Sequence, residues 1–332
     1  MNTLVLEEPG RLGWREPHDP PLAPDEARVL VRRIGICGTD LHAYRGRQPF
    51  FEYPRVLGHE LAVEVESVGT NGDASLVGRW CAVRPYINDP GSPASRRGKS
   101  NCCPSMRVLG VHIDGGMGSR LTLPSRLLHP VDAVGEEVSA EVVALAEPLA
   151  IGCHAVRRGD PQADESVLVI GAGPIGLAVL QFARLRSQRV TVLDLNERRL
   201  AFCRDRLGIA DARCETDDGE HFDCVFDATG HPGSMRSAVD RVAHGGKLVY
   251  VGLHTGDVTF PDPLFHSREM TLLASRNATA EDFDLVLSEL TAGRVDAESM
   301  ITHCLTLDEL PGAFESFYGD ADLIKVVVEV PA

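Results

Sequence analysis

The chain lacks an excess of positive charge. Its 48 acidic residues outnumber its 33 lysines and arginines, and the formal net charge is −15 over 332 residues. A nucleic-acid partner favours a basic face, so this balance argues against one. A long apolar run is also missing: the best candidate, residues 167–180, contains three glycines and a proline, and we expect no membrane span. The first residues turn acidic at Glu7 and Glu8, so we expect no secretory signal.

The cysteines do not form the pattern of a disulfide framework. There are nine of them, an odd number, in a chain of 332 residues. Disulfide frameworks are typical of small secreted domains, whereas free thiols persist in a reducing cytosol. We therefore expect a cytoplasmic protein in which a few cysteines bind metal and the rest are buried as small apolar side chains.

Two kinds of pattern divide the chain, whose length suggests two domains. As far as about residue 145, short segments such as 28–34 and 61–68 alternate with period two between Gly/Pro turns, which predicts a barrel-like β domain. From about residue 165, apolar strands alternate with helical patterns, which predicts a parallel sheet with helices on both faces. The apolar strand at 323–330 is expected to return to the first domain. The chain shows no internal repeat.

A glycine-rich turn, Gly171-Ala172-Gly173-Pro174-Ile175-Gly176, lies between a predicted strand and a predicted helix. The first glycine permits the tight turn, the second lets the backbone approach a pyrophosphate, and the third allows close packing of helix on strand. The N-terminus of the helix attracts the phosphates. The motif therefore predicts a dinucleotide site.

Asp194 stands 18 residues beyond Gly176, at the end of the next predicted strand. A carboxylate there accepts hydrogen bonds from the adenosine ribose and repels a 2′-phosphate, so NAD is favoured over NADP. Arg198 and Arg199 follow closely; a basic pair could receive a 2′-phosphate, but a solvated helix face is the preferred interpretation while Asp194 is present. We keep Arg199 among the candidate cofactor-binding residues.

Cys37 and the pair His59–Glu60 indicate a metal site. A thiolate, an imidazole and a carboxylate are the ligand set of a catalytic zinc site, in which three protein groups leave one position open. An open zinc position polarises an oxygen-bearing substrate. Taken singly, each residue has an ordinary explanation as a buried thiol, a histidine near a turn or a surface charge.

Four segments in order carry a resemblance to a known family: 35–42 (Gly-Ile-Cys-Gly-Thr-Asp-Leu-His), 53–60, 146–149 and the glycine turn. Together they resemble the zinc-containing medium-chain alcohol dehydrogenases, in particular the sorbitol, threonine and sugar-acid dehydrogenase branch. The resemblance covers nearly the whole chain. It implies a GroES-like barrel-type catalytic domain (1–148), a doubly wound Rossmann nucleotide domain (149–275) and a return to the catalytic domain (276–332). It also implies a homodimer or homotetramer.

The resemblance implies a role for each residue of the metal motif. Cys37, His59 and Glu60 match zinc ligands. Glu147 occupies a place where a glutamate of the polyol branch binds zinc directly or through water.

The resemblance also implies a proton relay. Thr39 matches the hydroxyl that contacts the reacting alcohol, His42 matches the histidine that ends the relay, and Asp40 matches the acid that orients the zinc-bound histidine. Zinc lowers the pKa of a bound alcohol, so an alkoxide exists near neutral pH. A histidine titrates in the range needed to receive the released proton.

A second, structural zinc is not expected. Members of the family often hold one in a lobe with four cysteines, which would fall at 89, 92, 95 and 103. This chain has Asp89, Ser92, Ser95 and Cys103, which do not make a closed tetrahedral zinc site. We expect hydrogen bonds and packing to hold the lobe.

The leading hypothesis is a zinc- and NAD-dependent dehydrogenase that acts on a secondary alcohol of a polyol, sugar or sugar acid. Alternatives are an aldehyde or ketone reductase of the same family and a nucleotide-binding regulator that has lost catalysis. The retained metal and relay residues argue against that loss. The zinc-free quinone reductase branch lacks the Cys/His/Glu set and is disfavoured. Which alcohol is oxidised stays open.

Overall fold

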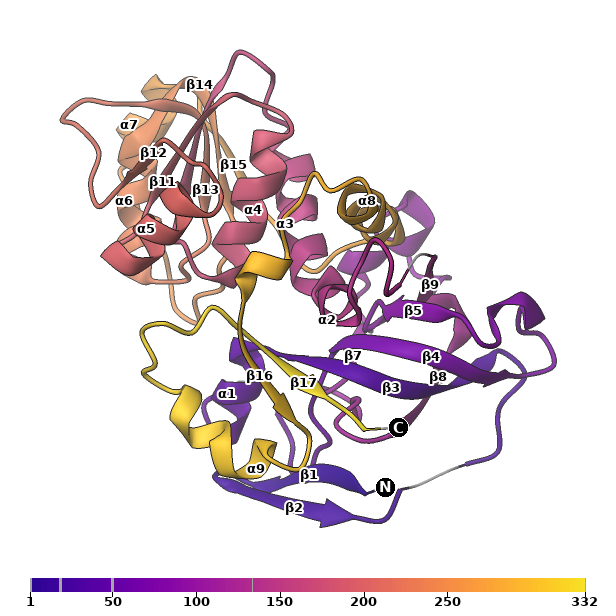
Figure 1. The fold of residues 1–332 in the computed structure, drawn as a ribbon. Coiled ribbons are helices and arrows are strands. Elements are labelled where there is room, and N and C mark those ends of the chain that lie inside the picture. Colours follow the sequence, from indigo (N-terminus) through magenta and orange to yellow (C-terminus); the bar gives the residue numbers. More distant parts are fainter. Residues whose placement is uncertain (1, 18–19, 49–50, 133, 332) are drawn as a thin grey trace. The chain divides into compact units, whose positions relative to one another are not determined.

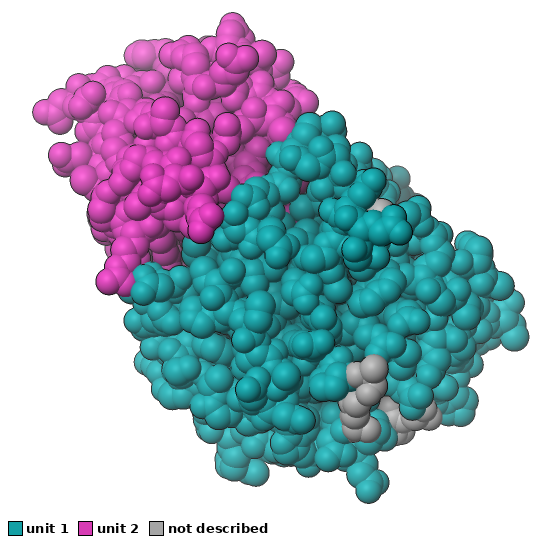
Figure 2. Space-filling model, in the orientation of Figure 1, with its two compact units in different colours: residues 1–147, 279–332 teal, residues 148–278 magenta. Residues whose placement is uncertain are grey.

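The computed structural model of the chain describes residues 2–17, 20–48, 51–132 and 134–331. It divides the chain into two compact units (Figure 2). Unit 1 combines Met1–Glu147 with Thr279–Ala332, and unit 2 is Pro148–Ala278. The chain thus changes unit after residues 147 and 278, where the sequence suggested changes after 148 and 275. Among the described residues, no helix has both the length and the apolar character that a membrane span requires.

Unit 1 is built on a seven-stranded sheet (Figure 1). Its strands follow the order β16-β17-β3-β4-β5-β9, and β8 also pairs with β3. Only β16 and β17 are parallel; the other pairs are antiparallel. The strands are β3 (Glu26–Ile36), β4 (Glu60–Val68), β5 (Trp80–Val83), β8 (Arg120–Pro124), β9 (Leu128–Val131), β16 (Ile301–Thr306) and β17 (Lys325–Glu329).

The core of unit 1 forms because alternate side chains of these strands point to one side. On β3, Ala27, Val29 and Val31 are buried at every second position, as the period-two pattern predicts. The remaining elements surround this sheet: β1 (Thr3–Glu8), β2 (Arg11–Arg15), β6 (Tyr86–Ile87), β7 (Arg107–Val108), α1 (Gly38–Tyr44), α2 (Ala140–Ala144), α8 (Ala280–Thr291) and α9 (Leu310–Ala313).

Unit 2 contains a six-stranded sheet in which all neighbours are parallel, in the order β12-β11-β10-β13-β14-β15. Figure 1 shows helices on both sides of this sheet. The strands are β10 (Ser166–Ile170), β11 (Arg189–Leu193), β12 (Asp211–Arg213), β13 (Phe222–Asp227), β14 (Val242–Tyr250) and β15 (Thr271–Ala274). The helices are α3 (Ala146–Gly159, which begins at the unit boundary), α4 (Pro174–Arg184), α5 (Glu197–Asp205), α6 (Pro232–Ala238) and α7 (Asp262–Ser267).

The pairing of β3 with β4 and β17 positions the candidate metal site. Gly35 on β3 lies opposite Glu60 on β4 and opposite Val327 on β17. A side chain at Gly35 is excluded, because its Cβ would lie 2.1 Å from Oε2 of Glu60. This glycine therefore leaves space for the glutamate to lie across β3. Cys37 follows at the end of the same strand.

Candidate functional site

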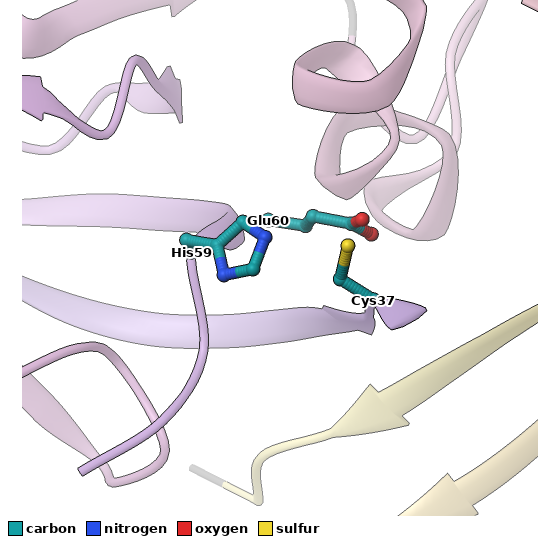
Figure 3. A group of neighbouring side chains, drawn as sticks. All are labelled: Cys37, His59 and Glu60. Atoms are coloured by element: carbon teal, nitrogen blue, oxygen red, sulfur yellow. The ribbon is translucent and has the colours of Figure 1, made fainter. Parts of the chain in front are cut away.

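Cys37, His59 and Glu60 come together in unit 1, where β3 ends and β4 begins. One ligand atom from each side chain lies within 4.8 Å of those of the other two (Figure 3). Figure 3 shows the sulfur of Cys37 and the carboxylate of Glu60 pointing toward one another. His59 and Glu60 are buried, and Cys37 is partly buried. Two segments more than twenty residues apart thus form one polar cluster inside the protein.

Asp40 contacts the backbone of Cys37 and faces the imidazole of His59. Its Oδ2 accepts a hydrogen bond of 2.9 Å from the backbone N–H of Cys37, closing a capping box at the start of α1. Its Oδ1 lies 3.8 Å from Nδ1 of His59. The structure therefore places Asp40 behind the imidazole, where a carboxylate orients a metal-bound histidine.

The cluster fits a zinc ion by its donors and by an unsatisfied atom. Oε2 of Glu60 is buried without a hydrogen-bond partner. Buried polar atoms in folded proteins are nearly always paired, so this oxygen is suited to bind a metal ion. A thiolate, an imidazole and a carboxylate suit Zn²⁺.

The electrostatics of the cluster also favour a cation. Burial disfavours a charged imidazole, but the neighbouring Asp40 and Cys37 raise the pKa of His59 well above its ordinary value. Burial raises the pKa of Asp40, and the nearby Glu60 adds to this effect. Positive charge is therefore stabilised at this point in the protein.

Lys325 belongs to the cluster, although the sequence analysis did not name it. Its side chain is buried, with a relative exposure of 2% for the residue. The ammonium Nζ forms a close ion pair with Oε1 of Glu60 and donates a hydrogen bond of 3.2 Å to the carbonyl of Ile36. One signal was present: Lys325 interrupts an otherwise apolar strand, and a lysine in a buried strand needs an acidic partner.

Glu147 lies near the cluster but outside it. It sits in the first turn of α3 and is buried. Among the described residues, the group whose ligand atoms lie within 4.8 Å of one another contains Cys37, His59 and Glu60 and not Glu147. The hydroxyl of Tyr86, a residue that the sequence did not single out, donates a short hydrogen bond to Oε1 of Glu147.

Thr39 and His42 lie on α1, next to the cluster. The hydroxyl of Thr39 is 3.6 Å from the sulfur of Cys37. His42 is exposed, and its Nδ1 lies 3.4 Å from the hydroxyl of Tyr318. The guanidinium of Arg45 lies 3.6 Å from the centre of the Tyr318 ring, so the tyrosine contacts both His42 and Arg45.

In unit 2, the glycine-rich turn joins β10 to α4. Gly171 has a φ of +98°, and a Cβ on Gly176 would lie 1.7 Å from the carbonyl oxygen of Gly171, so both positions require glycine. Gly173 is the N-cap of α4, and Pro174 and Ile175 open the helix. The N-terminus of α4 therefore lies at the glycine turn, where a helix attracts phosphate groups.

Asp194 and Arg199 lie beside this turn. Oδ2 of Asp194 accepts a hydrogen bond of 2.6 Å from the N–H of Ala172, and Oδ1 accepts one of 2.8 Å from the N–H of Asn196. The guanidinium of Arg199 lies 3.9 Å from the Asp194 carboxylate. It is also 3.8 Å from the point where a Cβ of Gly173 would lie. An acid and a base thus share the edge of the glycine turn.

Comparison with known proteins gives the family. Residues 23–133 match the alcohol dehydrogenase GroES-like domain, and residues 174–292 match the zinc-binding dehydrogenase domain. The chain is 38% identical to L-galactonate-5-dehydrogenase of Escherichia coli K12, over 99% of this chain and 98% of that protein. The chain belongs to the zinc-type alcohol dehydrogenase family. It is also 32% identical to sorbitol dehydrogenase of Arabidopsis thaliana, over 93% of this chain and 89% of that protein.

A solved structure supports the same assignment. The RspB alcohol dehydrogenase of Escherichia coli CFT073, complexed with NADH, superposes on this zinc-type alcohol dehydrogenase with a TM-score of 0.91. The two are 28% identical, and the match covers 99% of each chain. The resemblance carried by the motifs is thereby confirmed, and so is the expected fold of a GroES-like domain with a Rossmann domain. The protein is an oxidoreductase of the sugar and polyol branch.

In this zinc-type dehydrogenase, hydrogen bonds connect Asp89, Ser92, Ser95 and Cys103. These are the four positions at which cysteines would be needed to hold a structural zinc. The sulfur of Cys103 lies 3.3 Å from the N–H of Asp89, which donates to it, and 3.4 Å from the hydroxyl of Ser105. The hydroxyl of Ser92 donates to that of Ser95 over 2.9 Å. The four positions thus lie in one polar network of the lobe.

Replacement of Lys325 by methionine should destabilise this dehydrogenase strongly. Methionine keeps much of the volume but leaves Glu60 buried without a cation beside it. Removing one partner of a buried ion pair costs about 3–5 kcal/mol of the free energy of unfolding. Added zinc should recover part of this loss, because it places a cation beside Glu60 in the absence of the lysine. Urea unfolding of the zinc-stripped and zinc-loaded variant measures both effects.

Lys247→Met is the matched control. Lys247 also donates to two backbone carbonyls, of Gly159 and Asp160, but it is partly exposed and lies 3.7 Å from its acidic neighbour Glu165. We expect this variant to lose about 1 kcal/mol. Equal losses in the two variants would contradict the assignment of Lys325 as the fixed counter-charge of the cluster.

Proposed function

We propose that this dehydrogenase oxidises a secondary alcohol of a sugar acid, sugar or polyol, with one zinc ion and NAD. The buried Cys37–His59–Glu60 cluster, with its unpaired carboxylate oxygen, carries the proposal. The 38% identity to an L-galactonate-5-dehydrogenase and the 32% identity to a sorbitol dehydrogenase support the substrate class. A hydroxyl-rich substrate of this kind needs a polar site that holds one of its oxygens.

Cys37, His59 and Glu60 would hold the zinc, and Asp40 and Lys325 would keep two of these ligands in place. Asp40 sets the tautomer of His59 by facing its Nδ1, and Lys325 fixes Glu60 by one oxygen. Zinc, when bound, supplies a Lewis acid that lowers the pKa of the substrate hydroxyl. The nicotinamide, when bound, supplies the hydride acceptor.

Thr39 and His42 would move the proton. The Thr39 hydroxyl, beside the Cys37 sulfur, accepts the proton of the substrate hydroxyl and passes its own onward. His42 stands three residues later on α1, a spacing that puts both side chains on the same helix face. Tyr318 contacts Nδ1 of His42, which leaves Nε2 to receive the proton.

Replacement of Cys37 by serine should remove both zinc and turnover while leaving NAD binding largely intact. Substitutions behind the ligands of metal sites typically cost 10–100-fold, so loss of a ligand should lower kcat by more than about 100-fold. Metal analysis, NAD titration and a rate assay with polyols, sugar acids and small alcohols measure the three properties. Cys102→Ser, at an exposed thiol of the same unit, is the control.

The wild-type protein in that experiment also tests the number of zinc ions. We expect one per chain, because the lobe offers the cluster of Asp89, Ser92, Ser95 and Cys103 in place of four thiolates. Two zinc ions per chain would contradict a single metal site, and turnover that survives in Cys37→Ser would contradict the catalytic zinc. Reduction of ketones without oxidation of any polyol would favour the reductase alternative.

Asp194 should set the preference for NAD over NADP, with Arg199 acting against it. The Asp194→Asn variant keeps the volume and one of the two acceptor oxygens, but it removes the charge that repels a 2′-phosphate. We expect it to lower the ratio of kcat/KM for NAD to that for NADP by about tenfold, which corresponds to about 1.4 kcal/mol. A second substitution, Arg199→Gln, should reverse the gain for NADP. An unchanged ratio in Asp194→Asn would contradict this account of cofactor choice.

Two copies of the chain would pair through the edge strand β15. This strand ends the sheet of unit 2, and its residue Leu272 is 38% exposed. An exposed edge with apolar side chains is a template for pairing with another strand. The homodimer or homotetramer that the family resemblance implies would be built on such pairs.

Leu272→Lys should weaken this pairing, because a charged side chain on an edge strand disfavours association. Light scattering should give at least twice the chain mass of 35.9 kDa for the wild type and a shift toward that mass for the variant. Leu285→Lys is the control, since Leu285 is equally exposed but lies on α8 of unit 1. A monomeric wild type, or the same shift in both variants, would contradict the pairing.

We keep a reducing, cytoplasmic setting as part of the proposal. The nine cysteines are all free thiols in the structure, and most of them are buried. Free thiols persist where glutathione and thioredoxin keep them reduced. Cell fractionation tests this location, and recovery of the protein outside the cytoplasm would contradict it.

A further inference from the structure

Two buried carboxylates lie at the candidate zinc site, and the structure holds them by different means. Oε1 of Glu60 pairs with the ammonium of Lys325. Oε1 of Glu147 accepts a hydrogen bond from the phenol of Tyr86. An ammonium cancels the charge of its carboxylate, whereas a phenol orients a carboxylate and leaves its charge in place.

The two carboxylates also differ in position. Glu60 belongs to the group whose ligand atoms lie within 4.8 Å of one another, and among the described residues that group does not include Glu147. Tetrahedral zinc, with ligand bonds of about 2.0–2.3 Å, brings its ligand atoms to about 3.5 Å from one another. Glu147 would therefore have to move toward the cluster in order to bind the metal.

The surroundings of Tyr86 restrict a movement of Glu147 toward the cluster. The residue is 2% exposed and lies on β6, which pairs with β7. Its ring meets the edge of Phe283 on α8, with 6.5 Å between the ring centres. Its carbonyl accepts a hydrogen bond of 3.4 Å from the guanidinium of Arg84. The phenol is thus fixed by the sheet, by a neighbouring ring and by Arg84, and Glu147 is held at its end.

We propose that Tyr86 is a positioning residue that keeps Glu147 out of the coordination sphere of the zinc. Three ligands, Cys37, His59 and Glu60, then leave the fourth position open for the substrate oxygen. The inference rests on the proposed function, because it presumes a zinc ion at this cluster. Its consequence is specific: loss of the phenol releases Glu147 toward the metal, and a fourth protein ligand turns an open site into a closed one.

The Tyr86→Phe variant tests the proposal, since it removes the hydroxyl and keeps the ring. Zinc should leave the variant more slowly than the wild type in the presence of a chelator, because a fourth protein ligand then holds the ion. The cobalt-substituted variant should show a changed visible spectrum, which reports the number and type of ligands. KM for the alcohol should rise, because Glu147 competes with the substrate for the open position.

Glu147→Gln supplies the second test and does not depend on the folding of Tyr86→Phe. If Glu147 is not a ligand, its replacement should leave the rate of zinc loss and the cobalt spectrum as in the wild type. The double variant Tyr86→Phe/Glu147→Gln should lack the slow zinc loss of Tyr86→Phe, because the effect of Tyr86 passes through Glu147. Tyr53→Phe is the control, since its hydroxyl bonds to the carbonyl of Ala43 in the same unit.

Several outcomes would overturn the proposal. Faster zinc loss in Glu147→Gln would make Glu147 a direct ligand. An unchanged rate of zinc loss and an unchanged spectrum in folded Tyr86→Phe would show that the phenol does not restrain the carboxylate. Equal effects of Tyr86→Phe with and without Glu147 would show that Tyr86 acts by another route. A failure of the proposed function is distinguishable from all of these, because it appears in the wild type as absence of bound zinc or of alcohol oxidation.

Discussion

A buried ion pair between Lys325 and Glu60 is the interaction on which the arrangement of unit 1 around its candidate site depends. Lys325 belongs to the C-terminal strand β17 and Glu60 to β4, and β3 runs between them with Gly35 at the crossing point. Charges removed from water are tolerated only when they are paired and hydrogen-bonded, so this contact disfavours any other register of the three strands. Because Cys37 and His59 adjoin these strands, the same contact places the thiol and the imidazole.

Acidic groups outnumber basic groups around this ion pair, and the excess of negative charge favours the binding of a metal ion. Cys37, Asp40, Glu60 and Glu147 are all acidic groups at or near the cluster, whereas Lys325 is their fixed cation. A buried excess of negative charge raises the pKa of His59 and attracts positive charge. A neutral phenol at Glu147 fits this arrangement, because a second lysine there would compete with the metal. The site thus combines attraction for a cation with restraint on which oxygen atoms reach it.

Much of the fold could be predicted, because its strands and helices follow from short-range patterns of apolar and polar residues in the sequence. Period-two segments became β3 and β4, and strand–helix alternation became the parallel sheet of unit 2. The glycine turn was readable because steric limits on the backbone act locally, as the φ of Gly171 shows. The choice between NAD and NADP depends less on the local sequence. Asp194 is engaged by two backbone N–H groups and lies beside Arg199, so an acid at the end of a strand is only part of the balance.

The sequence by itself determined the family and the order of the two kinds of domain. It also identified Cys37, His59 and Glu60 as candidate ligands, because they belong to short motifs whose residues are close together in the chain. Only the tertiary structure decided which residues hold those ligands. Lys325 is 265 residues from Glu60 in sequence, and Tyr86 is 61 residues from Glu147. No local pattern connects such partners. The strand pairing of β17 with β3 and the burial of Tyr86 beside α3 bring them together, because a buried charge or hydroxyl must find its partner wherever the chain has folded.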